Sequence, residues 1–374
     1  MKSIFIYLSV FVTSCIALNM LQARQGISKN CKSICIYHEM NTYIFLGIFF
    51  TVPIITLYSL RDGVGTDFYS YQIDYLRYQE ITIKEYASKH FSGDSEYYCE
   101  IGFFLLNKIA PSYVGLQFIV AFLMCFLIFK SVTNIKDKYS HPLSLYIFLC
   151  LNFSYSMNGI RYVVALSFIL LGYTYLSQNR IKYFVVCVIC ASLFHKSSLI
   201  CLPFILLKNF NSNKINRIRD ILVLGFIFSF PLLVELLLTM ASYIPVFERY
   251  FNSAIYSLNK SDISSKRWLL HIIPVLIPIL FFSKNKIRQS RQYKTMFLIY
   301  LLEFPFRNIG LYNEWYGRLA RIPQVIEMLL VPIMIKSVKN KNSRVVLLIY
   351  FICWYTFYFI YYGMDTVVPY QWIL

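Results

Sequence analysis

The sequence contains few charged residues, and acids are especially scarce. Only 14% of its 374 residues are charged, 18 of them are Asp or Glu, and 58% of all residues are hydrophobic. Soluble globular domains carry about 25% charged residues, so this composition excludes that class. We therefore expect an all-α fold, a polytopic integral membrane protein.

Several chemical signatures are also missing. The sequence lacks internal repeats and low-complexity tracts, and Gly63-Val64-Gly65 is too short for the phosphate-binding loop of a soluble nucleotide-dependent enzyme. Of the ten cysteines, only Cys99 falls clearly in a segment expected outside the membrane, which argues against a disulfide framework or a structural zinc site. We predict no cofactor and no metal site, although the spacing of Asp62, Asp67 and Asp74 leaves a metal open.

Long apolar runs dominate the chain instead. A helix needs roughly 20 mostly apolar residues to cross a bilayer, and about twelve stretches qualify or nearly qualify by that measure. Some of the short ones between 142 and 208 could be re-entrant or tilted. The pattern predicts a single membrane domain, 1–374, with two larger extracytoplasmic segments at about 61–111 and 242–266. The predicted spans lie near residues 3–21, 43–60, 112–133, 142–157, 162–178, 182–194, 197–208, 220–241, 267–283, 293–304, 319–335 and 344–363.

The basic residues are distributed unevenly between the two sides of this arrangement. Short loops that are rich in Lys and Arg stay on the cytoplasmic side of a membrane. Six loops on one side hold 21 basic and three acidic residues, and so carry the whole formal net charge of +18. Because this charge is scattered, it does not form the single patch of a nucleic-acid-binding protein. We interpret this side as cytoplasmic, which places both termini outside. The six loops lie near residues 22–42, 130–141, 178–183, 208–220, 284–294 and 336–344.

Three polar signatures then fall together on the outer side. They are Arg61-Asp62-Gly63-Val64-Gly65-Thr66-Asp67, Asn158-Gly159-Ile160-Arg161 and Phe194-His195-Lys196-Ser197. Ionisable groups near membrane depth are costly unless they are paired or face a polar cavity, so they are functional candidates. Long side chains can instead extend toward lipid headgroups, but the short side chain of His195 cannot reach far. Gly159 predicts a tight turn that places Arg161 at the head of a helix.

This combination of side chains favours an anionic lipid headgroup as ligand. Guanidinium groups bind phosphate oxygens in pairs, and a neighbouring carboxylate such as Asp67 can act as a base. The first outer segment is also rich in Tyr, which collects at membrane interfaces for reasons of solvation. We expect a functional role only for Tyr69 and Tyr71, which adjoin the first signature. In the second half, a further polar group is expected around an outer loop: Glu303, Arg307, Glu314, Tyr316, Arg318 and Arg321.

The three signatures and their order resemble the EpsG-like, Wzy-type polysaccharide polymerases. The resemblance covers about residues 43–208 and includes Lys182-Tyr183-Phe184 and the run from Ala191 to Ser198. Phe68 and Tyr162 stand where such proteins often have Tyr and Gln. The resemblance implies a bacterial inner-membrane glycosyltransferase that joins lipid-linked oligosaccharide repeat units into O-antigen, capsule or exopolysaccharide. Its donor and acceptor would both be linked to undecaprenyl diphosphate, and a chain-length regulator and a flippase would be partners.

We therefore predict an active site on the extracytoplasmic side, with glycosyl transfer at the outer leaflet. Asp67 or His195 would accept the proton of the acceptor hydroxyl, and the positive charges would stabilise the departing lipid diphosphate. Two other functions remain open, a ligase that uses the same carrier and a non-catalytic flippase or transporter. The predicted catalytic residues are Asp67, Arg161 and His195. The predicted substrate-binding residues are Arg61, Gly65, Tyr69, Tyr71, Asn158, Lys196, Arg307 and Arg318.

Overall fold

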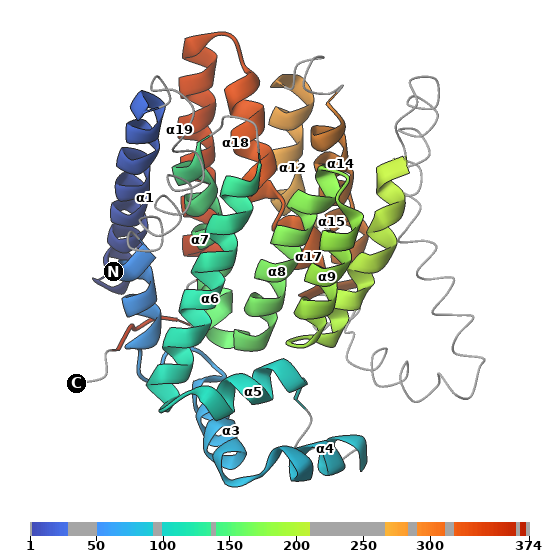
Figure 1. The fold of residues 1–374 in the computed structure, drawn as a ribbon. Coiled ribbons are helices and arrows are strands. Elements are labelled where there is room, and N and C mark those ends of the chain that lie inside the picture. The colour runs from blue at the N-terminus through green and yellow to red at the C-terminus, as the bar shows by residue number, and fades with distance from the viewer. Residues whose placement is uncertain are drawn as a thin grey trace.

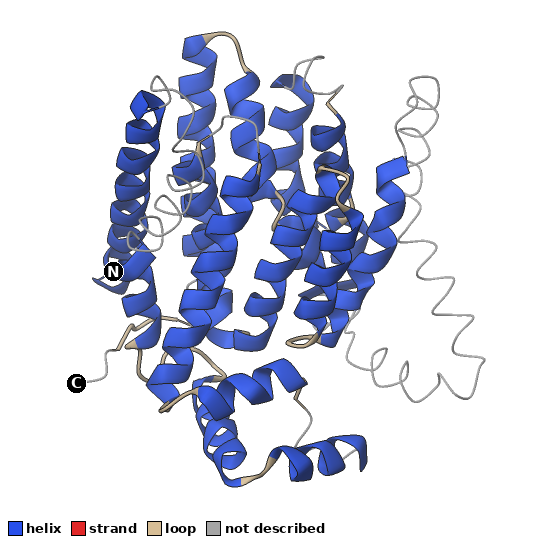
Figure 2. Cartoon of the chain, viewed as in Figure 1, coloured by secondary structure: helices blue, strands red, loops and turns tan. Residues whose placement is uncertain are grey.

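The computed structural model describes most of the chain, and every regular element within the described residues is a helix (Figure 2). The predicted span at 220–241 and all but the last residue of the predicted outer segment 242–266 lie outside this part. The described residues are 2–28, 51–92, 99–135, 140–209, 266–282, 290–310, 318–363 and 367–371.

Most of the helices run side by side and form a bundle (Figure 1). Residues 51–59 add a further helical segment. Every predicted span that falls wholly within the described residues coincides with one helix or with consecutive helices, while the number of membrane crossings stays a prediction. The bundle elements are α1 (Lys2–Ser28), α6 (Tyr113–Asn134), α7 (His141–Asn158), α8 (Ile160–Ser177), α9 (Ile181–Ser192), η2 (Lys196–Asn209), α12 (Lys266–Phe282), α14 (Arg291–Leu301), α15 (Glu303–Gly310), η3 (Arg318–Ala320), α17 (Arg321–Gln324), α18 (Glu327–Ser337), α19 (Lys341–Tyr358) and η4 (Phe359–Gly363).

Within the described residues, four helices are long and apolar enough to cross a membrane: Lys2–Met20, Tyr113–Asn134, Ile160–Ser177 and Lys341–Gly363. These helices differ in burial: 83% of the apolar window of α8 is buried, but only 28% of the windows of α1 and α19. α8 therefore lies inside the bundle, and α1 and α19 lie at its periphery. α7 is also buried along most of its length and carries polar residues such as Asn152 and Ser156 inside. A helix covered by protein on all sides does not need the hydropathy of a lipid-facing one.

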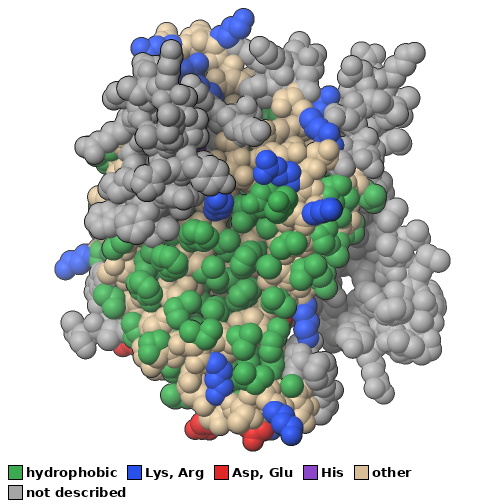
Figure 3. Space-filling view, viewed as in Figure 1, with side chains coloured by type: hydrophobic (Ala, Val, Ile, Leu, Met, Phe, Trp, Pro, Cys, Tyr) green, Lys and Arg blue, Asp and Glu red, His purple; other side chains and the backbone are tan. Residues whose placement is uncertain are grey.

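The charged side chains separate along the bundle. In the view of Figure 3, hydrophobic side chains cover the middle, Lys and Arg lie toward both ends, and the visible Asp and Glu lie toward the lower end. The upper end includes the α8–α9 turn with Arg180 and the connection from α18 to α19 with Lys339. An apolar belt between two polar ends is the arrangement that a bilayer requires.

Three short helices lie at the lower end of the bundle, α3 (Phe68–Glu80), α4 (Ile83–Ser92) and α5 (Ile101–Ile109) (Figure 1). We call this the α3–α5 layer. Aromatic rings hold it together: Tyr71 packs edge-on against Phe103 with centroids 5.7 Å apart, and Tyr78 packs against Phe104 at 5.6 Å. Most described tyrosines of this segment are thus packing residues, because their rings are buried between these helices.

The last described residues close the same end of the bundle. The backbone N–H of Tyr370 donates to Ser3 Oγ at 3.0 Å, and that of Asp62 donates to the carbonyl oxygen of Gln371 at 3.0 Å. The hydroxyl of Tyr7 donates to the carbonyl oxygen of Val367 at 2.9 Å. Residues at the start of α1 and residues 367–371 therefore contact each other and the loop before α3, while the placement of both termini outside stays a prediction.

Candidate functional site

The second polar signature forms a break between two buried helices. α7 ends at Asn158 and α8 begins at Ile160, with Gly159 alone between them. The N–H of Gly159 donates to the carbonyl oxygen of Tyr155 at 2.8 Å, and a Cβ at Gly159 would lie 3.1 Å from the Tyr155 ring. The predicted tight turn is therefore present, and it places Arg161 in the first turn of α8.

The first polar signature docks onto this break. The backbone N–H of Thr66 donates to Asn158 Oδ1 at 2.8 Å. Gly65 has a φ of +104°, and a Cβ there would lie 2.7 Å from Asn158 Oδ1 and 2.9 Å from the carbonyl oxygen of Met157. Only glycine combines this backbone conformation with so close an approach. Asp67 follows directly, at the head of α3, and its Oδ1 accepts a hydrogen bond from Thr66 Oγ1 at 3.2 Å.

Arg61, at the start of the same signature, points into the protein. Its side chain is fully buried, its Nε donates to Gln117 Oε1 at 2.8 Å, and its Cζ lies 4.4 Å from the centre of the Tyr58 ring. Neither Nη atom has a hydrogen-bond partner among the described residues. Arg61 thus occupies an interior position, without direct access to the outer surface.

Glu100 joins the second and third polar signatures. Its Oε2 lies 2.9 Å from Arg161 Nη1, and its Oε1 accepts the backbone N–H of Lys196 at 3.1 Å. The next turn adds a main-chain contact, because the N–H of Gly102 donates to the carbonyl oxygen of Leu193 at 2.8 Å. One carboxylate therefore ties the α3–α5 layer to α8 and to the start of η2.

His195 lies in the turn between α9 and η2, next to this ion pair. Its Nδ1 is 2.7 Å from Ser197 Oγ, and its ring packs edge-on against Tyr162 with centroids 5.0 Å apart. Burial lowers the pKa of His195, the charge of Glu100 raises it, and the charges of Arg161 and Arg318 lower it. The net shift is downward from 6.5, so the imidazole is neutral at pH 7.

Tyr71 is a further neighbour of Arg161. It lies on α3, is buried, and interacts electrostatically with both Arg161 and Asp67. Burial raises the pKa of Tyr71 to about 12, so its hydroxyl keeps its proton. Tyr69, two residues earlier, is exposed, and its hydroxyl lies over Gly63. The two tyrosines singled out in the sequence therefore occupy different environments.

The second half of the chain reaches the site through two arginines. The hydroxyl of Tyr162 donates to the carbonyl oxygen of Arg318 at 2.5 Å. Arg321 Nη1 donates to the carbonyl oxygen of Leu151 at 3.1 Å, and its Cζ lies 4.0 Å from the centre of the Tyr155 ring. These contacts place η3 and α17 against the ends of α7 and α8, beside His195.

Glu303 and Arg307 form a buried ion pair on α15, and Glu303 also interacts with Arg321. Arg307 Nε donates to Glu303 Oε1 at 2.6 Å, and Glu303 is fully buried. The hydroxyl of Tyr355 donates to the buried Glu327 at 2.7 Å, and Glu327 interacts with Glu303. The sequence groups Arg307 with Arg318, but in the structure its Nε is bonded to a buried acid. Glu314 and Tyr316 lie outside the described residues.

The structure therefore gathers one set of the predicted residues at the lower end of the bundle, namely Gly65, Asp67, Tyr69, Tyr71, Asn158, Arg161, His195, Lys196 and Arg318. Arg61 is buried beneath this set, and Arg307 is paired with the buried Glu303. In the part of the chain that the structure describes, no three His, Cys, Asp or Glu side chains gather as metal ligands would.

Sequence reasoning missed Glu100, Tyr162 as a packing partner of His195, and the contact of Arg321 with Tyr155. For Glu100 one signal was available: it is the acid directly before the apolar run that becomes α5. Its partner Arg161 is 61 residues away in the sequence, so no local pattern connects the two.

Replacing Gly65 tests how the first signature docks. In Gly65→Ala, the methyl group would clash with Asn158 and the backbone of Met157, and φ would stay unfavourable. We expect a loss of stability of about 1–3 kcal/mol, measured as a lower melting temperature of the purified protein in nanodiscs. Asp62→Ala, an exposed change in the same loop that keeps the backbone bond to Gln371, serves as the control. Equal melting temperatures for Gly65→Ala and the parent protein would contradict this account.

The lowered pKa of His195 predicts a pH dependence of stability. The unfolded chain takes up this proton at a higher pH than the folded protein, so the free energy of unfolding should fall as the pH drops below 6.5. His195→Gln should lose part of that fall, whereas His141→Gln, at the opposite end of α7, should keep it. Melting temperatures at about pH 7.5 and about pH 5.5 measure the difference. An undiminished fall in His195→Gln would refute the buried neutral imidazole.

Comparison with known proteins places the chain in a family. No curated protein and no solved structure matches it. A sequence model of the EpsG family matches residues 43–372, which includes the three polar signatures, the α3–α5 layer and the arginines of η3 and α17. Because this match extends over most of the sequence, the chain belongs to the EpsG family.

Proposed function

We propose that this protein is a polysaccharide polymerase that acts at the outer leaflet of the bacterial inner membrane. It would transfer a growing glycan from undecaprenyl diphosphate to the terminal sugar of another lipid-linked repeat unit. Membership of the EpsG family supports a role in polysaccharide synthesis. The observation that carries the proposal is the Glu100 carboxylate, which brings Arg161 and the His195–Lys196 turn together, while Tyr71 interacts with both Arg161 and Asp67.

The positions of the charges also support this side of the membrane. The site lies at the lower end of the bundle, opposite the turn that carries Arg180 and the connection that carries Lys339. Short loops rich in Lys and Arg stay in the cytoplasm. The site would then face the extracytoplasmic side, where flipped lipid-linked units are presented.

The reaction needs a stabiliser for the leaving group. The bond between the anomeric carbon of the donor and the phosphate oxygen breaks, and negative charge develops on the lipid diphosphate. Arg161 and Arg318 interact with His195, Lys196 follows it in the chain, and all three suit this charge electrostatically. In this scheme Glu100 is a positioning residue, because its ion pair orients the guanidinium of Arg161.

The acceptor hydroxyl forms the new bond to the anomeric carbon and gives up its proton to a base. Asp67 and His195 are the two candidates. A neutral His195 can take up that proton, and its Nδ1 contact with Ser197 orients the ring. Asp67 lies at the N-terminus of α3, where the helix favours a negative charge. Arg61 would act indirectly in this scheme, because it is buried beneath the first signature.

Complementation of a deletion strain tests this function. Arg161→Ala and Asp67→Asn should leave lipid-linked glycan mostly as single repeat units, with polymer reduced roughly 100-fold or more. Arg161→Lys should give an intermediate yield, because it keeps the charge and loses paired hydrogen bonding. Mass-resolved lipid-linked glycan measures the outcome, with protein levels checked by immunoblot.

Arg180→Ala is the matched control, since Arg180 is an exposed arginine at the opposite end of the bundle. It should leave the polymer at the parental level. Full-length polymer with both Arg161→Ala and Asp67→Asn at normal protein levels would contradict the proposed active site. Polymer that accumulates unattached in the deletion strain would identify a ligase, and lipid-linked units that stay on the cytoplasmic leaflet would identify a flippase.

A further inference from the structure

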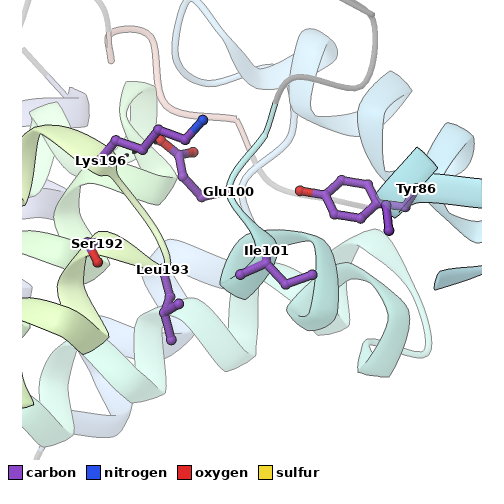
Figure 4. Close-up of a pocket in the computed structure, with 7 residues that line it drawn as sticks. Tyr86, Glu100, Ile101, Ser192, Leu193 and Lys196 are labelled. Atoms are coloured by element: carbon purple, nitrogen blue, oxygen red, sulfur yellow. Dashed lines mark hydrogen bonds between the residues drawn. The ribbon is translucent and has the colours of Figure 1, made fainter. Parts of the chain in front are cut away.

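A pocket of about 310 Å³ lies beside the Arg161–Glu100 ion pair. Its walls come from α4, the start of α5 and the turn between α9 and η2. In Figure 4, Glu100 and Lys196 lie together at one edge, Leu193 and Ile101 lie at another, and Tyr86 stands on the α4 side. Ala87 and Ser192 complete the lining. Most of this surface is apolar, and its polar groups are concentrated toward the ion pair.

The rear wall of the pocket is rigid. Tyr86 is buried, its hydroxyl donates to the carbonyl oxygen of Cys99, and its ring stacks on Phe104 with centroids 3.9 Å apart. The backbone bond between Gly102 and Leu193 fixes the opposite wall. The shape of the pocket is therefore set by packing before any ligand arrives.

The pocket continues into an exposed apolar stripe on α9. Val186, Ile189 and Leu193 are 56%, 50% and 42% exposed and follow one another at helical spacing along one face. This face belongs to the hydrophobic part of the bundle, so we take it to contact the hydrocarbon of the bilayer. Leu193 is both the last member of the stripe and a wall of the pocket. An apolar chain can thus pass from the bilayer into the pocket without crossing a polar surface.

α5 provides a second apolar edge. Ile101, Leu105 and Ile109 are exposed along one face of this short helix, while Phe103 and Phe104 are buried on the other. A helix with one exposed apolar face at the end of a membrane bundle suits the boundary between headgroups and hydrocarbon. Because Ile101 also lines the pocket, the opening lies between α5 and α9 at that boundary.

We propose that this pocket binds the phosphate-proximal isoprene units of a polyprenyl diphosphate, which enters sideways from the bilayer between α5 and α9. The inference rests on the proposed function and names the place where its lipid carrier docks. The diphosphate would lie at the polar edge, near Lys196 and the Arg161 guanidinium. The reacting sugar would then extend toward Asp67 and His195.

Size and charge favour this occupant over an ordinary phospholipid. A volume of about 310 Å³ is at the lower end of the range of small-molecule sites, so the pocket fits part of a single chain better than two acyl chains and a glycerol headgroup. Lys196 and Glu100 line its polar edge, and the Glu100 carboxylate pairs with the guanidinium of Arg161, which also interacts with Asp74. Lys196 and Arg161 could each bind one phosphate of a diphosphate, whereas a phosphodiester offers a single phosphate.

Site-specific photocrosslinking tests the proposal directly. A benzoyl-phenylalanine replaces Leu193 in one variant and Val186 in another, which lies on the same face of α9 away from the pocket. Each protein in nanodiscs is irradiated with an alkyne-tagged polyprenyl diphosphate that carries no sugar. We expect labelling at position 193 to exceed that at position 186 by at least roughly tenfold. Excess untagged polyprenyl diphosphate should compete, and polyprenol or phosphatidylglycerol should not.

Filling the pocket with a bulky side chain provides a second test of the proposal. Ala87→Trp places a large ring in the cavity, and Ile83→Trp adds the same ring at an exposed position of α4, one turn earlier. Ala87→Trp should reduce labelling by polyprenyl diphosphate in the 193 variant several-fold and raise KM for lipid-linked glycan more than it lowers kcat. Ile83→Trp should match the parent protein in both measurements, which controls for effects of tryptophan on folding.

The possible outcomes test the lipid-binding pocket and the proposed function independently. Equal labelling at positions 193 and 186, or competition by any lipid, would overturn the pocket even if the protein makes polymer. Unchanged labelling in Ala87→Trp would overturn it as well. Selective labelling by the sugar-free diphosphate in a protein that never forms polymer would support the pocket and reject the polymerase assignment.

Discussion

The site depends on one carboxylate. Glu100 pairs with Arg161 at the head of α8 and accepts the backbone N–H of Lys196 where η2 begins, so a single side chain joins segments that are far apart in the sequence. Hydrogen bonds to a charged acceptor are among the stronger ones in proteins, particularly when partly shielded from water. The same ion pair restricts the conformations of the Arg161 side chain. A site for an anionic ligand requires a guanidinium that is held in place in this way.

The bilayer imposes the second constraint. Polar groups inside the bundle must find partners in the protein, since hydrocarbon supplies none. The buried Glu303–Arg307 pair and the contact of Tyr355 with Glu327 meet part of this demand within the C-terminal half. Arg61 meets it only in part, through Gln117 and the face of Tyr58. Among the described residues, neither of its Nη atoms has a hydrogen-bond partner.

Local patterns predicted much of the fold and part of the site. Apolar runs and their spacing located the helices, because membrane crossing requires a minimum apolar length. Gly159 predicted the turn that places Arg161, since a single glycine between two apolar runs allows the backbone to reverse. The pattern did not distinguish Tyr69, which is exposed, from Tyr71, which is buried. That difference depends on α5, whose Phe103 covers one position of α3 and leaves the other open.

The sequence by itself determined the helical class, the segregation of positive charge and the three signatures that lie at one end of the bundle, because hydropathy and loop charge are local properties of the chain. Only the tertiary structure decided which charges meet. Arg61 and Arg161 are equivalent in a list of residues, yet packing by α6 buries the first and an acid from the α3–α5 layer engages the second. Burial and pairing are set by distant segments, and the energy of a charge depends on both.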